Sequence, residues 1–208
     1  MNTEAFTPYQ NIKRYEKTFE PIQFDDRVDL VGLFRITKYE AERVFGAGGI
    51  VPEGTPVKIA VPDGTNYFEG DLKICDADDP EVDGITYQKV IPVDTQFPYR
   101  RKLYQTAVFY GEKVTIVKGN FIAIWRNVFN VGTTNADIEA SIGSRIYAAD
   151  GVNGIVVAAP GFNGVPDPAT GKAIGKIIGT DELPVQHADN SQPLAGAIHK
   201  EIYVMVNI

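Results

Sequence analysis

The chain of 208 residues has little of the chemistry on which most enzymes and metalloproteins depend. Its single cysteine, Cys75, excludes an intramolecular disulfide and any metal site built from several cysteines. Its two histidines, His187 and His199, are twelve residues apart and lack the spacing of a zinc-binding helix. We therefore expect no metal centre and no cofactor, and stability that comes from packing, strand pairing or assembly.

Long apolar runs and positive charge are also scarce. No run approaches the roughly 18 apolar residues that cross a bilayer. Met1 to Phe6 lack the positive start and the apolar stretch of a signal peptide, so we expect a soluble protein made in a cytoplasm. Acidic residues outnumber basic ones by 27 to 20, and the formal charge of −7 repels a phosphate backbone on average. A dedicated nucleic-acid binder is therefore disfavoured.

Glycine, proline and aromatic residues, in contrast, are plentiful. The chain has 20 Gly, 13 Pro, 10 Tyr and 11 Phe, a mixture that favours short strands joined by tight turns over long helices. Hydrophobic residues make up 44% and charged residues 23%, as in ordinary soluble globular proteins. The sequence thus predicts a mainly β fold, an antiparallel barrel or sandwich with one or two short helices.

The first 27 residues differ from the rest of the chain. They show neither the alternation of a strand nor the stripe of a helix, and Pro8 and Pro21 interrupt them. Disordered tails are poor in aromatic residues, so we expect an extended arm that orders against a partner; packing on its own domain is the open alternative. Residues 28–208 then form the β-rich domain, as one unit or as two subdomains divided near 130–135. The arm's aromatic residues are Phe6, Tyr9, Tyr15, Phe19 and Phe24.

Two short helices are expected, the first from a clear local signal and the second from an ambiguous amphipathic segment that Gly143 interrupts. Thr37, with Glu40 three residues later, forms a capping box that begins the first helix. Gly46 is placed to end that helix in a left-handed conformation. The second helix is predicted over residues 135–140 and is followed by a strand over 144–148.

Strands are predicted over most of the remaining chain. The C-terminal residues 198–206 form a last strand that ties the end of the chain into a sheet. The longest β candidates are separated only by Gly111 and by Gly119-Asn120, so we expect a meander of three antiparallel strands. Its strands are 103–110, 114–118 and 121–129.

Charge is segregated into two blocks. Residues 71–85 hold six acidic residues against Lys73, and residues 97–126 hold six basic residues against Glu112. Such opposite blocks favour contact with each other or with a neighbouring copy. The acidic block contains the best cation candidate, although its spacing misses that of an EF-hand and a solvated turn is the favoured alternative. The carboxylates of this loop are Asp76, Asp78, Asp79, Glu81 and Asp83.

The common catalytic motifs are not matched. Gly171-Lys172 and Gly175-Lys176 are each followed by an aliphatic residue, where a phosphate-binding loop needs serine or threonine. The dinucleotide fingerprint fails because Val51 stands where its third glycine belongs. Cys75 lies on a predicted strand without the signature of a nucleophile, so we expect no enzyme.

The basic block also carries many aromatic residues, which leaves two interpretations. The rings stack single-stranded bases between the cations, or they form a core while the charges occupy the other face. The net negative charge of the chain favours the second interpretation. The cations then serve a protein contact, and the expected interface residues are Phe6, Tyr9, Tyr15, Phe19, Arg100 and Arg101.

Two stretches share one style of turn and strand. They are GGIVPEGTPVKIAV (48–61) and ASIGSRIYAADGVNGIVVAAPGFNGVPDPATGKAIGKIIGT (140–180), in which Gly54 and Gly143 each begin a turn that leads into a strand. A later strand contains Ile174-Gly175-Lys176. These motifs resemble the small β-barrel proteins that decorate the heads of tailed bacteriophages, and they cover about a quarter of the chain.

The resemblance implies a cement or auxiliary capsid protein with no catalytic residues. Proteins of this kind bind the outer surface of an assembled capsid, often as trimers, so the implied partners are the major capsid protein and other copies of the chain. A head-fibre base or a tail component is the first alternative. A carbohydrate-binding module is the alternative of another class, and its candidate rings are Trp125, Tyr99 and Tyr104.

Overall fold

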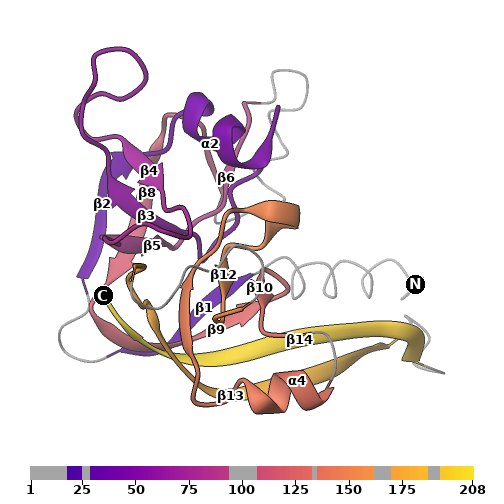
Figure 1. The fold of residues 1–208 in the computed structure, drawn as a ribbon. Helices are drawn as coiled ribbons and strands as arrows, with labels where there is room; N and C mark the ends of the chain where they lie inside the picture. The colour runs from indigo at the N-terminus through magenta and orange to yellow at the C-terminus, as the bar shows by residue number, and fades with distance from the viewer. Residues whose placement is uncertain (1–17, 25–28, 94–106, 133–134, 162–169, 187–192) are drawn as a thin grey trace.

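The computed structural model describes residues 18–24, 29–93, 107–132, 135–161, 170–186 and 193–208. The fold is mainly β, with 44% strand and 11% helix, which confirms the fold class predicted from the sequence. Two sheets carry most of the strands (Figure 1). Neighbouring strands are antiparallel except for two short parallel pairs, β10 with β12 and β6 with β7.

The first sheet has seven strands. Their order is β1 (Phe19–Phe24), β9 (Asn120–Arg126), β14 (Pro193–Asn207), β13 (Gly175–Gln186), β11 (Arg145–Ala148), β12 (Val157–Ala158) and β10 (Phe129–Asn130). The second sheet has five strands, in the order β2 (Asp29–Arg35), β8 (Lys113–Lys118), β5 (Gly84–Thr86), β3 (Pro56–Ile59) and β4 (Leu72–Ile74). A separate pair consists of β6 (Val90–Ile91) and β7 (Val108–Phe109).

One hydrophobic core joins the two sheets. Phe19, Trp125 and Ile202 of the seven-stranded sheet share a cluster of buried side chains with Ile85 and Val117 of the five-stranded sheet. A second cluster lies between the five-stranded sheet and the helix α2 (Lys38–Phe45). The inward faces of both sheets are therefore occupied, and among the described residues a partner can reach the outward faces and the loops.

The chain passes from the five-stranded sheet into the seven-stranded sheet at one sharp bend. Strand β8 ends at Lys118 and β9 begins at Asn120, so only Gly119 separates them. Gly119 has φ +113, a region that side chains with a Cβ rarely adopt. Its N–H donates to the carbonyl of Ile208 at 3.0 Å, and the Ile208 N–H donates back at 3.2 Å. The bend and the last residue of the chain thus hold each other in place.

The meander predicted for this region is wrong. Strand β8 pairs with β2 and β5, whereas β9 pairs with β1 and β14, and the two strands do not pair with each other. A hairpin would require both Gly119 and Asn120 in the turn, but Asn120 already pairs with Asn207 as part of β9. The glycine therefore turns the chain from one sheet into the other, as happens at the corners of packed sheets.

The signal for the start of the first helix, by contrast, was sufficient. Thr37 caps α2, with its Oγ1 accepting from the Glu40 N–H at 3.2 Å. Gly46 follows the helix with a positive φ of 79°, but its ψ is 179°, so the predicted left-handed conformation is wrong. The Glu40 carboxylate does not complete the capping box. It is buried, and it accepts hydrogen bonds from Arg43, from the Tyr67 hydroxyl and from the Ile74 N–H.

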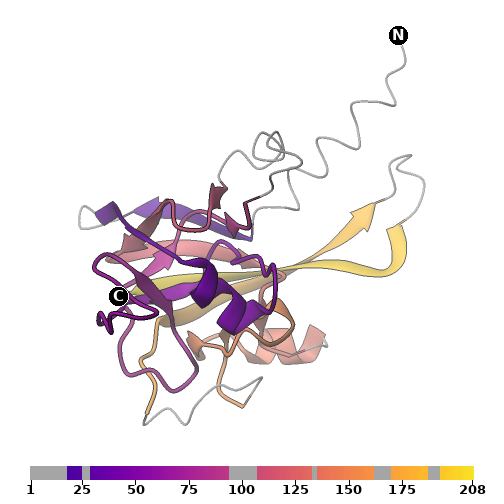
Figure 2. The ribbon, with the colours of Figure 1, turned by 90° about the horizontal axis from the view of Figure 1, so that it is seen from above.

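The second helix and the strands after it also match the sequence in part. Helix α4 spans Asn135–Ala140 and β11 spans Arg145–Ala148, while a 3-10 turn (Val152–Gly154) joins β11 to β12. The C-terminal strand was expected to begin at residue 198, but β14 begins at Pro193 and pairs with β13 over most of its length. Figure 2 shows the paired ends of β13 and β14 extending away from the two sheets.

Part of the predicted N-terminal arm belongs to the domain itself. Residues 19–24 form β1, an edge strand of the seven-stranded sheet paired with β9. Phe19 is fully buried, with its ring centroid 4.7 Å from that of Trp125 and 6.3 Å from that of Phe121. The arm boundary at residue 27 is therefore wrong, because this aromatic residue completes the core. Residues 1–17 lie outside the described part of the chain.

We predict that Gly119→Ala lowers the free energy of unfolding by about 1–3 kcal/mol, because a Cβ at this φ strains the bend. The matched control is Gly32→Ala in β2, where φ is ordinary and the nearest atom to an added Cβ is Thr115 Oγ1 at 3.7 Å. We expect the control to change stability by less than about 1 kcal/mol. Urea denaturation of the two variants measures the difference, and equal losses would contradict the role given to Gly119.

Candidate functional site

The outer face of the seven-stranded sheet is the candidate surface for attachment. Ala123, Val204 and Ile177 are fully buried on three adjacent strands of this sheet. Since side chains alternate along a strand, their neighbours Ile122, Met205 and Lys176 point to the opposite face. The strand registers align these neighbours across five strands, in the row Gln23 (β1), Ile122 (β9), Met205 (β14), Lys176 (β13) and Arg145 (β11).

This row changes in character from one end to the other. Its centre is apolar: Met205 is 54% exposed and Ile122 is half-buried. Ile22 and Ile178, each at an irregularity in its strand, are 49% and 41% exposed. The other end is cationic, with Lys176 and Arg145 both exposed. We call the row together with Ile22 and Ile178 the outer sheet face.

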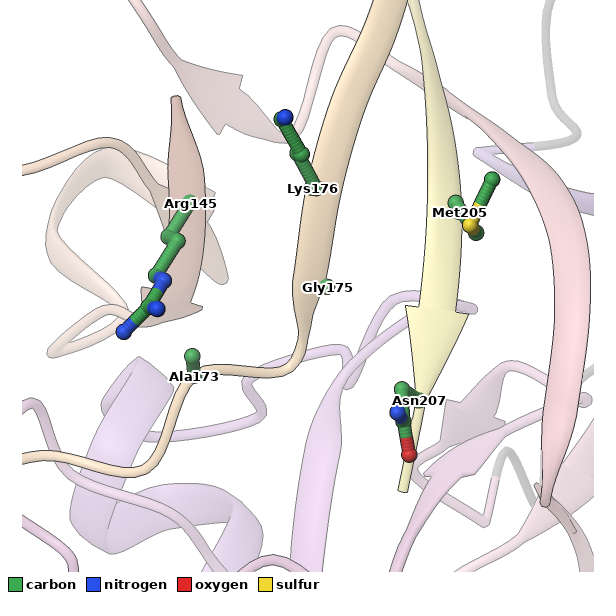
Figure 3. A pocket seen from close by; sticks show the side chains of 6 residues that line it. All are labelled: Arg145, Ala173, Gly175, Lys176, Met205 and Asn207. Carbon is green, nitrogen blue, oxygen red and sulfur yellow. The ribbon is translucent and has the colours of Figure 1, made fainter. Parts of the chain in front are cut away.

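The cationic end brings two positive charges into direct opposition. Arg145 of β11 and Lys176 of β13 are register partners, so their side chains leave the sheet next to each other. Within the described residues, neither has a carboxylate within ion-pair distance. Like charges directly opposite each other in a sheet destabilise it. In Figure 3 the two side chains point away from each other, as this repulsion favours.

A shallow hollow lies between these two cations and the end of β14. It has a volume of about 390 Å³ and is lined by Arg145, Lys176, Ala173, Gly175, Met205 and Asn207 (Figure 3). The hollow thus combines two cationic groups, one amide and an apolar thioether. Such a lining suits an anionic group attached to an apolar one.

Gly175 keeps β13 close to β14 at this point. A Cβ on Gly175 would lie 2.4 Å from the Met205 carbonyl oxygen and 2.9 Å from Val204 Cγ1, both closer than real Cβ contacts. The absence of a side chain therefore lets Lys176 and Met205 stand side by side across the two strands.

Cys75, for which the sequence shows no signature of a nucleophile, is buried in the core. It is 1% exposed, and its Sγ lies 3.5 Å from the carbonyl oxygen of Glu81. Burial raises the pKa of the thiol well above its ordinary value, with the nearby Asp79 carboxylate adding to the rise. At neutral pH the thiolate is therefore scarce and inaccessible, which makes Cys75 unsuited to nucleophilic chemistry.

The acidic loop binds the chain's own cations and amides. Asp79 pairs with Lys58 and accepts from the Asp76 N–H, and Asp76 pairs with Arg43 at 3.1 Å and with Lys73 at 3.6 Å. Asp83 accepts from the backbone N–H of Ile59 at 2.7 Å. Among the described residues, no group of three or more His, Cys, Asp or Glu side chains is placed to hold a metal ion. The carboxylates of the predicted cation loop therefore fix a turn, and only Asp78 and Glu81 of the five are exposed.

Of the four aromatic residues of the basic block that the structure describes, Phe121 and Trp125 are buried, and Phe109 and Tyr110 are half-buried. Trp125 is fully buried, and its Nε1 donates to the Gly54 carbonyl at 3.0 Å. Phe121 is buried in the same cluster. Neither ring is available to stack on a base or a sugar, which supports the interpretation that these rings form a core. Tyr99 and Tyr104 lie outside the described residues.

The interface residues expected from the sequence are largely outside the described chain. Phe6, Tyr9, Tyr15, Arg100 and Arg101 belong to residues 1–17 and 94–106. The remaining one, Phe19, is buried between Trp125 and Phe121, so its selection as an interface residue is wrong. The sequence around Phe19 is interrupted by prolines and lacks the alternation of a strand, so it did not indicate that β1 would be an edge strand of the sheet.

Sequence reasoning did not single out Arg145, Lys176 and Met205 as site residues. Arg145 and Lys176 stand inside the glycine-led motifs GSRIY and IGK, but the sequence does not specify which strand residues face each other across 31 positions. Local alternation gives no clean signal here, because Ile174 and Ile177 are fully buried whereas Lys176 and Ile178 are exposed, and the strand is irregular at Ile178.

We predict that Cys75 resists Ellman's reagent in the native protein at about pH 8 and reacts on unfolding in guanidinium chloride, with rates that differ by at least roughly a hundredfold. The thiol pKa is raised in the folded state, so above about pH 8.5 the thiol of the unfolded chain is deprotonated while that of the folded protein keeps its proton. Deprotonation then favours the unfolded state. The free energy of unfolding should therefore fall as the pH rises above that value, and it should fall less in Cys75→Ala. Rapid native labelling would contradict the buried, inert thiol.

Comparisons of this chain with family models, with curated proteins and with solved structures find no match. Among the described residues, no helix has both the length and the apolar character needed to cross a membrane.

Proposed function

We propose that the protein is a non-enzymatic structural protein of a tailed-phage virion, which binds the outer surface of the capsid and stabilises it. The observation that carries this proposal is the outer sheet face, a register-aligned surface with an apolar centre and a cationic end. Its proposed partners are the major capsid protein and, within an oligomer such as a trimer, other copies of the chain.

The outer sheet face has the anatomy of a protein interface. Interfaces combine a partly apolar centre with polar residues at the rim, and methionine and arginine are enriched in them. Met205, Ile22 and Ile178 are each about half exposed, and covering the exposed part of each side chain contributes about 1 kcal/mol. This modest gain per copy suits a protein that acts in many copies on a repeating lattice, where multivalent contact raises the overall affinity.

The resemblance to decoration proteins adds independent support. The longer of its two stretches, residues 140–180, supplies β11, β12 and the first half of β13. Those strands include Arg145 and Lys176, so the part of the chain that carries the resemblance also builds the cationic end of the outer sheet face.

The alternatives are supported less well. A head-fibre base or a tail component could use the same surface, and the resemblance favours the capsid. A carbohydrate-binding module loses its leading candidate because Trp125 is buried. An enzyme that uses the thiol loses support because Cys75 is buried with a raised pKa.

We predict that the purified protein co-sediments in a saturable manner with mature heads of the phage whose genome encodes it. Met205→Glu should weaken this binding about tenfold, because it places a charge at the apolar centre of the face. The matched control is Ile59→Glu on the five-stranded sheet, a residue of similar exposure that should leave binding unchanged. Failure of the unmodified protein to bind heads, together with its absence from purified virions, would refute the proposal.

A further inference from the structure

The described chain contains other directly opposed cations. Lys58 and Lys73 of β3 and β4 are register partners, and they pair with Asp79 and Asp76. The closest parallel to Arg145 and Lys176 is a second arginine–lysine pair. Arg35 of β2 and Lys113 of β8 are register partners in the five-stranded sheet, as Arg145 and Lys176 are in the seven-stranded sheet. Each of these two pairs joins one arginine and one lysine on neighbouring antiparallel strands. The two pairs differ in what surrounds them.

In the five-stranded sheet the chain itself supplies a carboxylate. Asp71 is fully buried, and its Oδ1 accepts from the Arg35 Nε at 2.5 Å. Its Oδ2 accepts from the Phe68 N–H at 2.8 Å, which fixes the carboxylate in place. The repulsion between the two cations is thus offset by one negative charge held beside the arginine.

No described residue fills the equivalent place next to Arg145 and Lys176. The hollow of about 390 Å³ lies there instead, open to solvent and bordered by Met205 and Asn207. An arginine–lysine pair therefore has a carboxylate beside it in the five-stranded sheet, whereas the pair in the seven-stranded sheet has none among the described residues.

We infer that this hollow binds a carboxylate side chain from an acidic segment of the shell protein, in the role that Asp71 has beside Arg35. The identity of the partner as a shell protein rests on the proposed function; the carboxylate chemistry rests on the two cation pairs. The guanidinium of Arg145 offers paired donors to a carboxylate. The Lys176 side chain points away from the guanidinium (Figure 3), so its ammonium adds to the positive potential around the hollow. Met205 and Ala173 provide an apolar surface for the residue that carries or flanks the acid.

A protein carboxylate fits the hollow better than the phosphates of a nucleic acid. Stable binding to a nucleic acid requires several phosphate contacts, whereas the hollow presents two cations on a chain of formal charge −7. The chain's own acidic block offers little to the hollow, because Asp71, Asp76, Asp79 and Asp83 are already bound within the chain and only Asp78 and Glu81 are exposed. We therefore assign the carboxylate to a separate protein with an exposed acidic segment.

The sharpest variant is Lys176→Glu, because it moves stability and binding in opposite directions. The new carboxylate lies opposite Arg145, so the repulsion becomes attraction and the melting temperature should rise or stay the same. The same carboxylate occupies the place of the partner's acid, so affinity for heads should fall about tenfold. Lys176→Arg keeps the charge and should bind as the unmodified protein does.

The matched control is Lys113→Glu, the equivalent change in the completed pair. It alters the net charge by the same amount but should leave affinity for heads unchanged. Binding of the unmodified protein should weaken as salt increases, and that dependence should be smaller in Lys176→Glu. Equal loss of affinity in Lys113→Glu and Lys176→Glu would show a general charge effect and overturn the inference.

A second measurement separates this inference from the proposed function. Fluorescence anisotropy should detect binding of a labelled decaglutamate peptide to the unmodified protein and its loss in Lys176→Glu, with no comparable binding of an oligothymidylate of the same length. Peptide binding without binding to heads would refute the virion proposal and keep the carboxylate site. Binding to heads that Lys176→Glu does not weaken, or tighter binding of the oligonucleotide, would overturn the carboxylate site and keep the virion proposal.

Discussion

The structure depends on one bend in the backbone. Gly119 turns a nearly continuous strand from the five-stranded sheet into the seven-stranded sheet, and reciprocal hydrogen bonds with Ile208 hold the turn. Because β8 and β9 enter different sheets, the inward faces of both sheets share one core around Trp125 and Val117. The outward face of β9, β14 and β13 is then left exposed, which makes it available for attachment.

Electrostatic pairing distinguishes the cationic end of the outer sheet face from the other charged clusters of the described chain. On the same side of the seven-stranded sheet, Arg126 pairs with Glu20 at 2.9 Å and with Glu201 at 2.5 Å. Charged side chains close to the five-stranded sheet find partners within the chain: Arg35 binds Asp71, Lys58 binds Asp79, and Arg43 binds both Glu40 and Asp76. The predicted cation loop is part of this internal network. Arg145 and Lys176 have no such partner among the described residues, although an equivalent pair elsewhere in the fold has one. The positive charges of these two residues are therefore available to a carboxylate of a binding partner.

Features set by neighbouring residues were predictable from the sequence, whereas features set by distant pairing were not. The Thr37 cap, the helix over residues 135–140 and the strand that begins near Arg145 follow from local signals. The role of Gly119 as a corner between two sheets does not follow from local signals, because a glycine with positive φ is equally suited to a hairpin turn and to a sheet corner. The candidate site depends on the register of β11 with β13 and of β13 with β14, which local composition does not encode.

The central claim, that the outer sheet face is the attachment surface, is tested most directly by hydroxyl-radical footprinting of the protein free and bound to phage heads. Met205 is 54% exposed on this face, and Tyr39, which is 45% exposed on α2, serves as an internal reference. We expect oxidation of Met205 to fall several-fold on binding while that of Tyr39 stays constant, because the partner covers only the outer sheet face. Unchanged oxidation of Met205 in the bound protein, with protection of Tyr39, would contradict the account.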